Sequence, residues 1–452
     1  MKLTVATNFD GDYLRFLDDY PVEEVYGKLP DDPFGGGRVK SSLPNVSWDD
    51  LRSHVKQCHE QGIWFNYLLN AASTNNKEFT RRGQRQLEKL LRRLEGMGVE
   101  AFTVASPYFL NVLKEFNPEF YVKVSVFAQV GDVRKARHWE NLGADEIVLD
   151  SMLVNREFDQ LEDIRDGVSI PLTLLANNNC LYGCALSPYH MNVIAAGSRR
   201  ESPTGGFLPD YCYLHCTAKK IDSPWKYLAA DWIRPEDLDR YEDIGYRRFK
   251  LAGRNIATHL LKKRVKAYSN RRYDGNLLDL TQDFGEIDGD NKQVESSATG
   301  WWGWIKWLWK AAPLNLTELL RLFRLNKKQG FTRVPELPSP VHVDNKELGE
   351  FLSGIIEMGG CRDRTCDDCG YCHQWSENAV TVNEQSRDEI LKDQPDLTES
   401  VRSGGQAHRE NRGSWYRRWR TGGSRDGDPR RRKGIFGKAL RSSNAPHRQG
   451  LW

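Results

Sequence analysis

Eight short segments rich in aliphatic and aromatic residues recur along the first part of the chain, and stretches with helical periodicity separate several of them. Strands that alternate with helices in this way predict parallel strands joined by helical crossovers. Eight such units over about 250 residues are typical of a (β/α)8, or TIM-like, barrel, which is the α/β fold class we favour. A doubly wound open sheet alternates in the same way, but no glycine fingerprint for a dinucleotide follows the first predicted strand. The predicted strands are Lys2–Ala6, Glu23–Tyr26, Trp64–Leu69, Ala101–Ala105, Lys123–Ala128, Glu146–Leu149, Leu172–Ala176 and Arg248–Leu251.

Polar and charged residues end or follow several of these strands. In a (β/α)8 barrel the reactive groups lie at the carboxyl ends of the strands, so we expect these residues at one rim. The candidates for substrate binding are Asn70, Asp150, Asn177, Lys250 and Arg254. The guanidinium of Arg254 matches the geometry of a phosphate or carboxylate group, and a solvated or salt-bridged arginine is the other open interpretation.

Two cysteine pairs follow the seventh predicted strand. Cys180 and Cys184 have three residues between them, and so have Cys212 and Cys216. Residues at positions i and i+4 share one face of a helical turn, so each pair can direct two thiolates to one point. The two pairs therefore predict a four-sulfur site at the mouth of the barrel. We favour a [4Fe-4S] cluster as its occupant, with zinc and unligated buried thiols as the alternatives.

A second group of four cysteines follows an expected amphipathic helix over Asn345–Met358. Its members are Cys361, Cys366, Cys369 and Cys372. The Cys-x2-Cys-x2-Cys core resembles ferredoxin-type runs, which predicts a second [4Fe-4S] cluster. Close cysteine pairs, with His373 as a substitute ligand, fit zinc equally well, and a disulfide is a third interpretation. Because the group is local in sequence, we expect it to bind its metal independently of the first.

The cysteine usage also bears on the compartment. Eight of the nine cysteines fall in the two groups, and the ninth, Cys58, lies in a helical pattern over Leu51–Gly62 where core packing is expected. The sequence starts directly as a strand with no secretory segment, and no run of about 18 apolar residues predicts a transmembrane helix. Metal ligation in a reducing cytoplasm therefore fits the cysteines better than disulfides.

The rest of the chain divides by composition. We expect a barrel over residues 1–256, a helical extension over 257–344, a cysteine-rich module over 345–375 and a disordered basic tail over 376–452. Within the extension, Trp301–Trp309 holds five tryptophans. Such a segment fits a helix packed on the barrel, or one that lies in a membrane interface or on a partner. Leu316–Leu325 predicts a further amphipathic helix.

These features, in this order, resemble peptidase family U32 over about residues 1–373. The resemblance rests on the opening strand, on Val25–Gly27 leading to Gly36–Arg38, on the cysteines after the seventh strand, on Phe249–Arg254, which is similar to the family's Phe-Lys-Ile-x-Gly-Arg segment, and on the helix that leads into the late cysteine group. It implies a barrel-like fold and, as in the better-understood members, a [4Fe-4S] cluster on four cysteines.

The resemblance also implies a range of functions. The family includes proteins described as proteases, RNA-modifying hydroxylation proteins linked to prephenate as oxygen donor, and paired accessory proteins of oxygen-independent ubiquinone synthesis. A protein partner of the same family is therefore a further expectation. The two Cys-x3-Cys pairs of this chain differ from the cysteine spacing of the hydroxylation proteins.

Three function classes remain. We favour an iron–sulfur redox or hydroxylation enzyme that acts on RNA or a small aromatic metabolite. A U32-type peptidase is the first alternative, although the sequence contains neither Gly-x-Ser-x-Gly nor His-Glu-x-x-His. A cysteine nucleophile would need a lowered pKa and a nearby base, and the grouped cysteines look committed to metal. A non-catalytic electron-transfer or scaffold protein is the second alternative.

The basic tail gives a first testable prediction. Residues 401–452 hold 14 Lys and Arg against 3 Asp and Glu. Deletion of this segment should leave the fold intact and weaken binding to RNA or an anionic surface, and the loss should be largest at low salt because cation–phosphate binding is salt-dependent. Fluorescence anisotropy with labelled RNA, and sedimentation with anionic vesicles, measure both effects across a salt series. Equal binding by the full and truncated chains at low salt would contradict the prediction and indicate that the tail is solvated and has no such partner.

Overall fold

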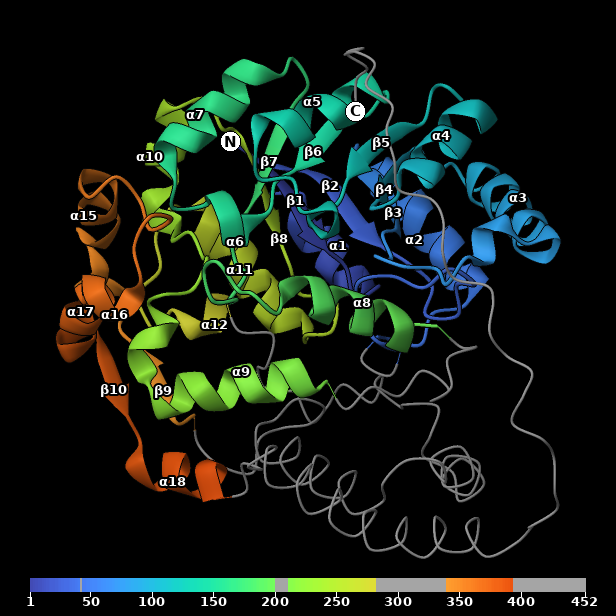
Figure 1. The fold of residues 1–452 in the computed structure, drawn as a ribbon. Coiled ribbons are helices and arrows are strands. Elements are labelled where there is room, and N and C mark those ends of the chain that lie inside the picture. Colours follow the sequence, from blue (N-terminus) through green and yellow to red (C-terminus); the bar gives the residue numbers. More distant parts are fainter. Residues whose placement is uncertain (41–42, 200–209, 282–338, 393–452) are drawn as a thin grey trace, which may run out of the picture. The chain divides into compact units, whose positions relative to one another are not determined.

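Eight parallel strands close into a barrel (Figure 1). The strands are β1 Lys2–Ala6, β2 Val22–Gly27, β3 Trp64–Leu69, β4 Ala101–Val104, β5 Tyr121–Val124, β6 Glu146–Val148, β7 Leu172–Leu175 and β8 Arg248–Leu251. Each strand pairs with its neighbours in sequence, and β8 pairs with β1, with Thr4 opposite Lys250. The closed order confirms the predicted (β/α)8 barrel and is incompatible with a doubly wound open sheet.

The computed structural model describes residues 1–40, 43–199, 210–281 and 339–392. All of the described residues belong to one compact unit. The expected helices over Trp301–Trp309 and Leu316–Leu325 and the basic tail lie outside the described residues.

Helices follow the strands and cover the outside of the barrel (Figure 1). The α-helices are α1 Gly11–Leu17, α2 Trp48–Glu60, α3 Arg81–Glu95, α4 Pro107–Phe116, α5 Val133–Asn141, α6 Ser151–Val154, α7 Phe158–Gly167, α8 Ser187–Gly197, α9 Tyr211–Asp222, α10 Leu238–Asp243, α11 Thr258–Ser269, α12 Leu278–Thr281, α15 Phe351–Glu357, α16 Cys366–Cys369, α17 Tyr371–Ala379 and α18 Glu384–Lys392. Short 3-10 helices are η2 Lys77–Phe79, η3 Val126–Ala128, η4 Pro224–Tyr227, η5 Pro235–Asp237 and η6 Asn345–Leu348, and β9 Val341–Val343 pairs antiparallel with β10 Val380–Val382.

The fifth strand differs from its prediction. It begins at Tyr121 and ends at Val124, whereas the sequence predicted a strand up to Ala128. The hydroxyl of Ser125 accepts a hydrogen bond from the Phe127 amide at 3.2 Å, and this local contact turns the chain into η3. A serine that bonds the backbone two residues on competes with strand pairing in this way.

The predicted helix over Asn345–Met358 is also interrupted. It consists of η6 and α15, with a break at Gly349 and Glu350. The buried Arg234 guanidinium donates to the carbonyl oxygens of Asn345 at 3.1 Å and Gly349 at 3.2 Å. Carbonyls that bind a buried arginine are less available for a continuous helix, which accounts for the break.

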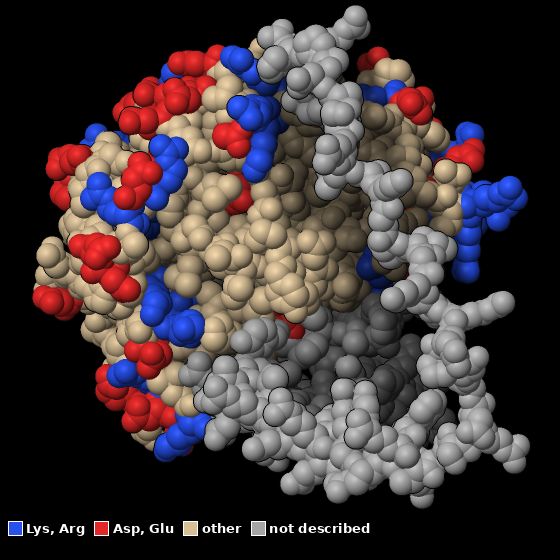
Figure 2. Space-filling view, in the orientation of Figure 1, with Lys and Arg blue, Asp and Glu red and all other residues tan. Residues whose placement is uncertain are grey.

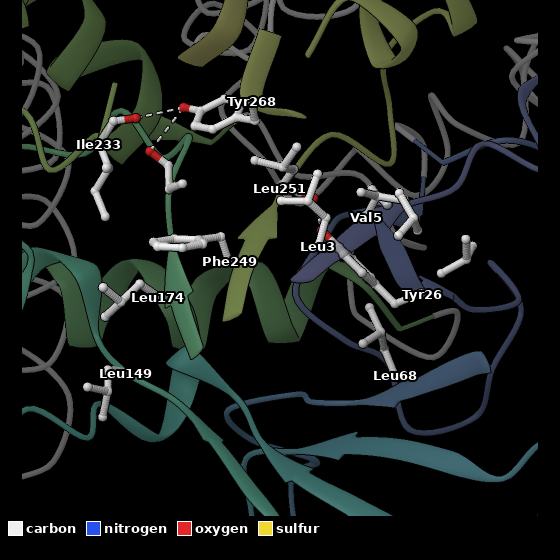
Figure 3. Close-up of a cluster of buried hydrophobic side chains, with 14 of the residues drawn as sticks. Leu3, Val5, Tyr26, Leu68, Leu149, Leu174, Ile233, Phe249, Leu251 and Tyr268 are labelled. Atoms are coloured by element: carbon white, nitrogen blue, oxygen red, sulfur yellow. Dashed lines mark hydrogen bonds between the residues drawn. The ribbon is translucent and has the colours of Figure 1, made fainter. Parts of the chain in front are cut away.

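The outer faces of the strands pack against the helices in one hydrophobic core. Figure 3 shows part of it, including Leu3, Leu174 and Phe249. The Tyr268 hydroxyl, from α11, lies 2.8 Å from the carbonyl oxygen of Ile233 and 3.4 Å from that of Ala176 (Figure 3). This contact fixes the end of β7, from which the first cysteine connection starts.

The inside of the barrel carries a buried charge cluster. The Lys123 ammonium lies 2.8 Å from a Glu24 oxygen and 3.0 Å from a Glu146 oxygen, and all three side chains are at most 3% exposed. Thr173 donates a further hydrogen bond to Glu146 at 2.7 Å. A lysine shared by two buried carboxylates ties β2, β5 and β6 together across the interior.

The surface of the unit is mixed in charge. Figure 2 shows Lys and Arg interspersed with Asp and Glu around the edge of the face in view, with fewer charges toward its middle. Among the described residues, none of the helices has the length and apolar character needed to cross a membrane.

The charge cluster gives a stability prediction. Lys123→Met should lower the free energy of unfolding by about 3–5 kcal/mol, because the buried Glu24 carboxylate loses its ion pair and Glu146 is left with the longer pair with Arg248 at 3.5 Å. Lys56→Met is the matched control: Lys56 pairs with Glu60 at 3.5 Å, but the two side chains are 78% and 60% exposed. Such a surface pair contributes less than about 1 kcal/mol. Equilibrium urea unfolding under reducing conditions measures both, and equal losses would contradict a supporting role for the buried cluster.

Candidate metal centre

The four cysteines of the first group lie around one cavity. Cys180 and Cys184 come from the connection after β7, and Cys212 and Cys216 come from α9. All four line a cavity of about 160 Å³, together with Asn178, Lys220, Tyr227 and other residues of the same rim. The two pairs, which are separated in sequence by residues 185–211, therefore face a common space, as the spacing predicted.

The two pairs reach the cavity by different backbones. Cys212 and Cys216 lie one turn apart on α9, whose N-cap Asp210 accepts a hydrogen bond from the Tyr213 amide at 3.2 Å. The prediction of a helical turn was wrong for Cys180 and Cys184, because that segment is a β-bridge followed by a turn. Gly183 takes a left-handed conformation there, with a φ of 64°, and this conformation favours glycine.

A segment that precedes η5, Leu228–Asp231, holds the first pair in place. We call it the strap. The Asp231 amide donates to the Cys180 carbonyl at 2.9 Å, and the Cys180 amide donates to an Asp231 carboxylate oxygen at 2.9 Å. Leu181 forms an antiparallel bridge with Ala230. The irregular connection thus has its backbone polar groups satisfied, which orients the Cys180 side chain.

Burial controls the protonation of these thiols. Removal from water raises the pKa of Cys180 well above its ordinary value, raises that of Cys184, and raises that of Cys212 to about 11. As free groups these three thiols are therefore protonated at neutral pH, and none of the three has the lowered pKa of a cysteine nucleophile. Coordination to a metal is the chemistry that would deprotonate them.

The spacing of the donors bears on the kind of metal group. Within the described residues, no three His, Cys, Asp or Glu side chains gather closely enough to hold a single ion. Tetrahedral zinc takes thiolates at bonds of about 2.3 Å, and a [4Fe-4S] cluster takes one thiolate on each iron. Four thiols that face one cavity are therefore donors that either metal group could use.

The second cysteine group surrounds a buried arginine. Cys361 precedes α16, which contains Cys366 and Cys369, and Cys372 lies on α17. Arg156 is 3% exposed, and its buried charge lies beside the thiols of Cys361 and Cys372, whose pKa values it lowers against the raising effect of burial. His373 stacks its ring on Trp225, with the centroids 4.0 Å apart. Cys58 is fully buried on α2, as expected of a core residue.

Two of the five predicted substrate-binding residues are asparagines. Asn177 donates to the carbonyls of Ala252 at 3.0 Å and Leu280 at 3.1 Å, and it accepts from the Ala252 amide at 2.6 Å. It thereby joins the ends of β7 and β8, and both of its amide protons are used within the protein. Asn70 donates to the Ser125 hydroxyl at 3.3 Å, and its buried Oδ1 has no hydrogen-bond partner among the described residues.

The three charged candidates lie at the same rim. The Lys250 ammonium lies 4.1 Å from the centroid of the Tyr26 ring, and burial lowers its pKa to about 8. Arg254 is 6% exposed. Asp150 caps α6 by accepting from the Met152 amide at 3.1 Å, and burial raises its pKa to about 7. In the described part of the chain, none of the five candidates lines the cysteine cavity.

Sequence reasoning missed the residues that support the cysteines. Asp231, Arg156 and Glu157 were not among the candidates, although Asp231 and Glu157 accept from the amides of Cys180 and Cys361, and Arg156 donates to carbonyls of the strap. Asp231 and Arg156 lie in connections where the sequence shows no motif. Neighbouring charges of opposite sign at 156 and 157 are common on surfaces, so they gave no sign of burial.

The raised pKa of Asp150 predicts how the stability of the protein depends on pH. An Asp whose folded pKa is raised contributes stability that is present below its unfolded pKa, near 3.8, and is lost as pH rises through about 7. Asp150→Asn keeps an oxygen that can cap α6 but removes the titration. Relative to this variant, the wild type should therefore lose about 3–4 kcal/mol of unfolding free energy between pH 4 and pH 8. Urea unfolding across that range measures the difference, and a difference that stays constant with pH would contradict the shift.

Comparison with known proteins identifies relatives of this chain. A curated relative, an uncharacterized protease of Methanocaldococcus jannaschii, is 30% identical over 285 residues, which are 62% of this chain and 82% of that protein. The solved structure of the U32 peptidase Mk0906 is 20% identical, and the match covers 56% of this chain and 93% of that one with a TM-score of 0.42. A mutant of FabK from Thermotoga maritima is 15% identical over 40% of this chain and 62% of its own, with a TM-score of 0.23.

The family comparison agrees with the resemblance seen in the sequence. The family model described as peptidase family U32 matches residues 19–277, a range that includes seven strands of the barrel and the four cysteines of the first group. This range is more than half of the chain. The chain therefore belongs to peptidase family U32.

Proposed function

We propose that this chain is an iron–sulfur enzyme of the U32 family that carries out a redox reaction, of the hydroxylation type, at the mouth of its barrel. The observation that carries the proposal is the convergence of Cys180, Cys184, Cys212 and Cys216 on one cavity. Its substrate class is RNA or a small aromatic metabolite. The carboxyl ends of the strands, where the cavity lies, are where barrel enzymes perform their chemistry.

The cavity offers both cofactor ligands and ligand-binding groups. Beside the cysteines it is lined by the aromatic rings of Tyr213 and Tyr227 and by the polar side chains of Asn178, Asn179 and Asn255. Aromatic rings can stack on a flat substrate group, and amide side chains can hydrogen-bond its edges. These groups support a planar, partly polar substrate.

The first cofactor in this proposal is a [4Fe-4S] cluster on Cys180, Cys184, Cys212 and Cys216. When bound, such a cluster supplies one-electron transfer. The protein contributes position and charge. Asp231 fixes the Cys180 backbone, and the buried Lys220 ammonium, which donates to the Asn179 carbonyl at 2.7 Å, stands near Cys180 as a counter-charge to the thiolates. Hydrogen bonds and charges of this kind tune the potential of a cluster.

The second cofactor is a second [4Fe-4S] cluster, or zinc, on Cys361, Cys366, Cys369 and Cys372. The buried Arg156 guanidinium supplies a positive charge beside two of these sulfurs. Such a charge offsets the accumulation of thiolates that either metal group requires. If the chain were an electron-transfer or scaffold protein without catalysis of its own, it would use the same two sites.

A peptidase is the second candidate function. It is favoured by the name of the family and by the name of the relative from Methanocaldococcus jannaschii. One hydroxyl–imidazole pair exists at the end of β1, where the Thr7 hydroxyl lies 3.0 Å from a His54 ring nitrogen. Both residues are at most 3% exposed, and burial lowers the pKa of His54 to about 4. The pair is therefore poorly placed to activate a nucleophile for a peptide substrate.

Compartment and partners follow from the same proposal. All nine cysteines are free thiols, which accords with a reducing cytoplasm. RNA or an anionic surface would contact the basic tail, and a second protein of the same family is the proposed protein partner.

The mouth site gives a prediction for single substitutions. After anaerobic purification, the wild type should carry about four irons and four sulfides for each cluster it holds. Cys184→Ala and Cys212→Ala should each lose the mouth cluster and the activity together, because a four-thiolate site loses its geometry with any one ligand. Iron and sulfide analysis with visible absorption measures this.

Cys58→Ala is the matched control. It removes a buried thiol that lies outside both groups. It should retain all metal and cost roughly 1 kcal/mol of stability. Full cofactor retention in Cys184→Ala would disprove the shared site. Metal-free protein that cleaves peptides would support the peptidase instead.

A further inference from the structure

Three consecutive residues after α6, Asn155–Glu157, contact both cysteine groups. We call them the junction. Asn155 donates to the carbonyls of Leu175 at 2.9 Å and Asp231 at 2.7 Å. All three junction residues are at most 5% exposed. The junction thus lies buried between the end of β7, the strap and the segment around Cys361.

The junction reaches the mouth site through the strap. The Arg156 guanidinium donates to the carbonyls of Leu228 and Ala230. Ala230 forms the bridge with Leu181, and Asp231 exchanges two hydrogen bonds with Cys180. The position of Arg156 is therefore linked to that of Cys180 through two layers of backbone contacts.

The junction reaches the second group directly. The same Arg156 guanidinium places its positive charge beside the Cys361 and Cys372 thiols, and it lies 5.4 Å from the ring centroids of Trp232 and Phe351. The Cys361 amide donates to Glu157 Oε1 at 2.8 Å. Gly360 makes this approach possible, because a Cβ at that position would collide with the Glu157 carboxylate.

One carboxylate oxygen is shared by the two groups. Glu157 Oε1, which binds the Cys361 amide, also lies 2.8 Å from the hydroxyl of Tyr182. The Tyr182 hydroxyl also lies 2.7 Å from the Leu153 carbonyl. Because it has a single proton, it donates to Glu157 or to the Leu153 carbonyl, one at a time. Tyr182 is the middle residue between Cys180 and Cys184. A single oxygen atom therefore joins the Cys180–Cys184 connection to the first residue of the second group.

We propose that the two cysteine groups form one cooperative metal-binding unit, coupled through the junction, so that metal in either group strengthens retention in the other. The inference rests on the proposed function, in which both groups bind metal. It replaces the independent behaviour expected from the sequence alone, where the two groups are separated by 144 residues, 217–360.

The physical basis is the cost of leaving buried polar groups unpaired. When the second group is ordered around its metal, Glu157 keeps the Cys361 amide as a donor, and the Arg156 charge keeps the sulfurs of Cys361 and Cys372 beside it. When it is disordered, a buried carboxylate and a buried guanidinium each lose partners, and such losses are costly. Both then rearrange toward other partners, which loosens the strap and Tyr182. Coupling of this kind is reciprocal by thermodynamic necessity.

The test compares retention of iron at the mouth site. The full chain is reconstituted anaerobically with ferrous iron and sulfide, and the rate of iron loss to a chelator is followed by absorption. Cys366→Ala disables the second group at its exposed cysteine, which belongs neither to the junction nor to the lining of the mouth cavity. We expect the iron that remains to leave at least about fivefold faster than the mouth iron of the wild type, the lower end of typical allosteric couplings.

A second variant tests the route. Tyr182→Phe keeps all eight ligands and removes only the hydroxyl, and it should also speed iron loss from the mouth. In the Tyr182→Phe background, Cys366→Ala should have a smaller effect than in the wild type, which is the mark of a shared contact in a double-mutant cycle. Tyr246→Phe is the control, because it removes a buried hydroxyl that lies 2.7 Å from the Leu161 carbonyl, away from both groups.

The outcomes separate the two proposals. If Cys366→Ala retains mouth iron that leaves at the wild-type rate, the groups are independent and the coupling is wrong, while the proposed function stands. If the wild type takes up no iron and sulfide in either group, the proposed function fails and the coupling fails with it. If the second group holds zinc, the same comparison applies with zinc content measured, and faster loss of mouth iron supports the coupling.

Discussion

Pairing of β1 with β8 closes the sheet, and the position of the mouth site depends on that closure. In a closed parallel barrel all strands end at the same rim, so the connections after β7 and β8 become neighbours. The Ala176 amide donates to the Lys250 carbonyl at 3.0 Å, and Asn177 joins the chain after β7 to Ala252 after β8. The first cysteine connection therefore begins at a point that two strands and α11 hold fixed.

An irregular connection can hold two ligands only if its backbone groups find partners elsewhere. A helix would satisfy them internally, as α9 does for Cys212 and Cys216. Between Cys180 and Cys184 the partners come from outside: Asp231 for Cys180, the Ala229 carbonyl for the Tyr182 amide at 3.1 Å, and the Met152 carbonyl for the Gly183 amide at 2.8 Å. The strap and α6 therefore hold the Cys180–Cys184 connection in place through these hydrogen bonds. Both segments thus affect the geometry of the mouth site.

Structural features that follow from the periodicity of the sequence were predicted well. Features that depend on tertiary contacts were not. Strand alternation predicted all eight strands, most of them to within one residue at each end, and the largest error lies where Ser125 turns the chain after β5. The helix over Asn345–Met358 was predicted as continuous because its apolar stripe is regular, and the buried Arg234 interrupts it. The spacing alone indicated that four cysteines would face one site, and all four line one cavity. It predicted the wrong backbone conformation for Cys180 and Cys184, however. Asp231 and Glu157 could not be found, because their roles arise from contacts 51 and 204 residues away in sequence.

The two cysteine groups differ in what the fold must supply to assemble them. The second spans twelve residues, from Cys361 to Cys372, and the first spans 37, from Cys180 to Cys216. Loop-closure entropy rises only slowly with length, so the difference in closure cost is about 1 kcal/mol. The greater difference lies in support: the Cys180 connection takes its partners from the strap, which docks only when β7 and β8 are in place. If the mouth site holds metal as proposed, that metal would stabilise the closed barrel specifically, because it would bind an arrangement that the open chain lacks. The second group can collect its own sulfurs locally, but it acquires the guanidinium of Arg156 and the carboxylate of Glu157 only by docking on that same closed barrel.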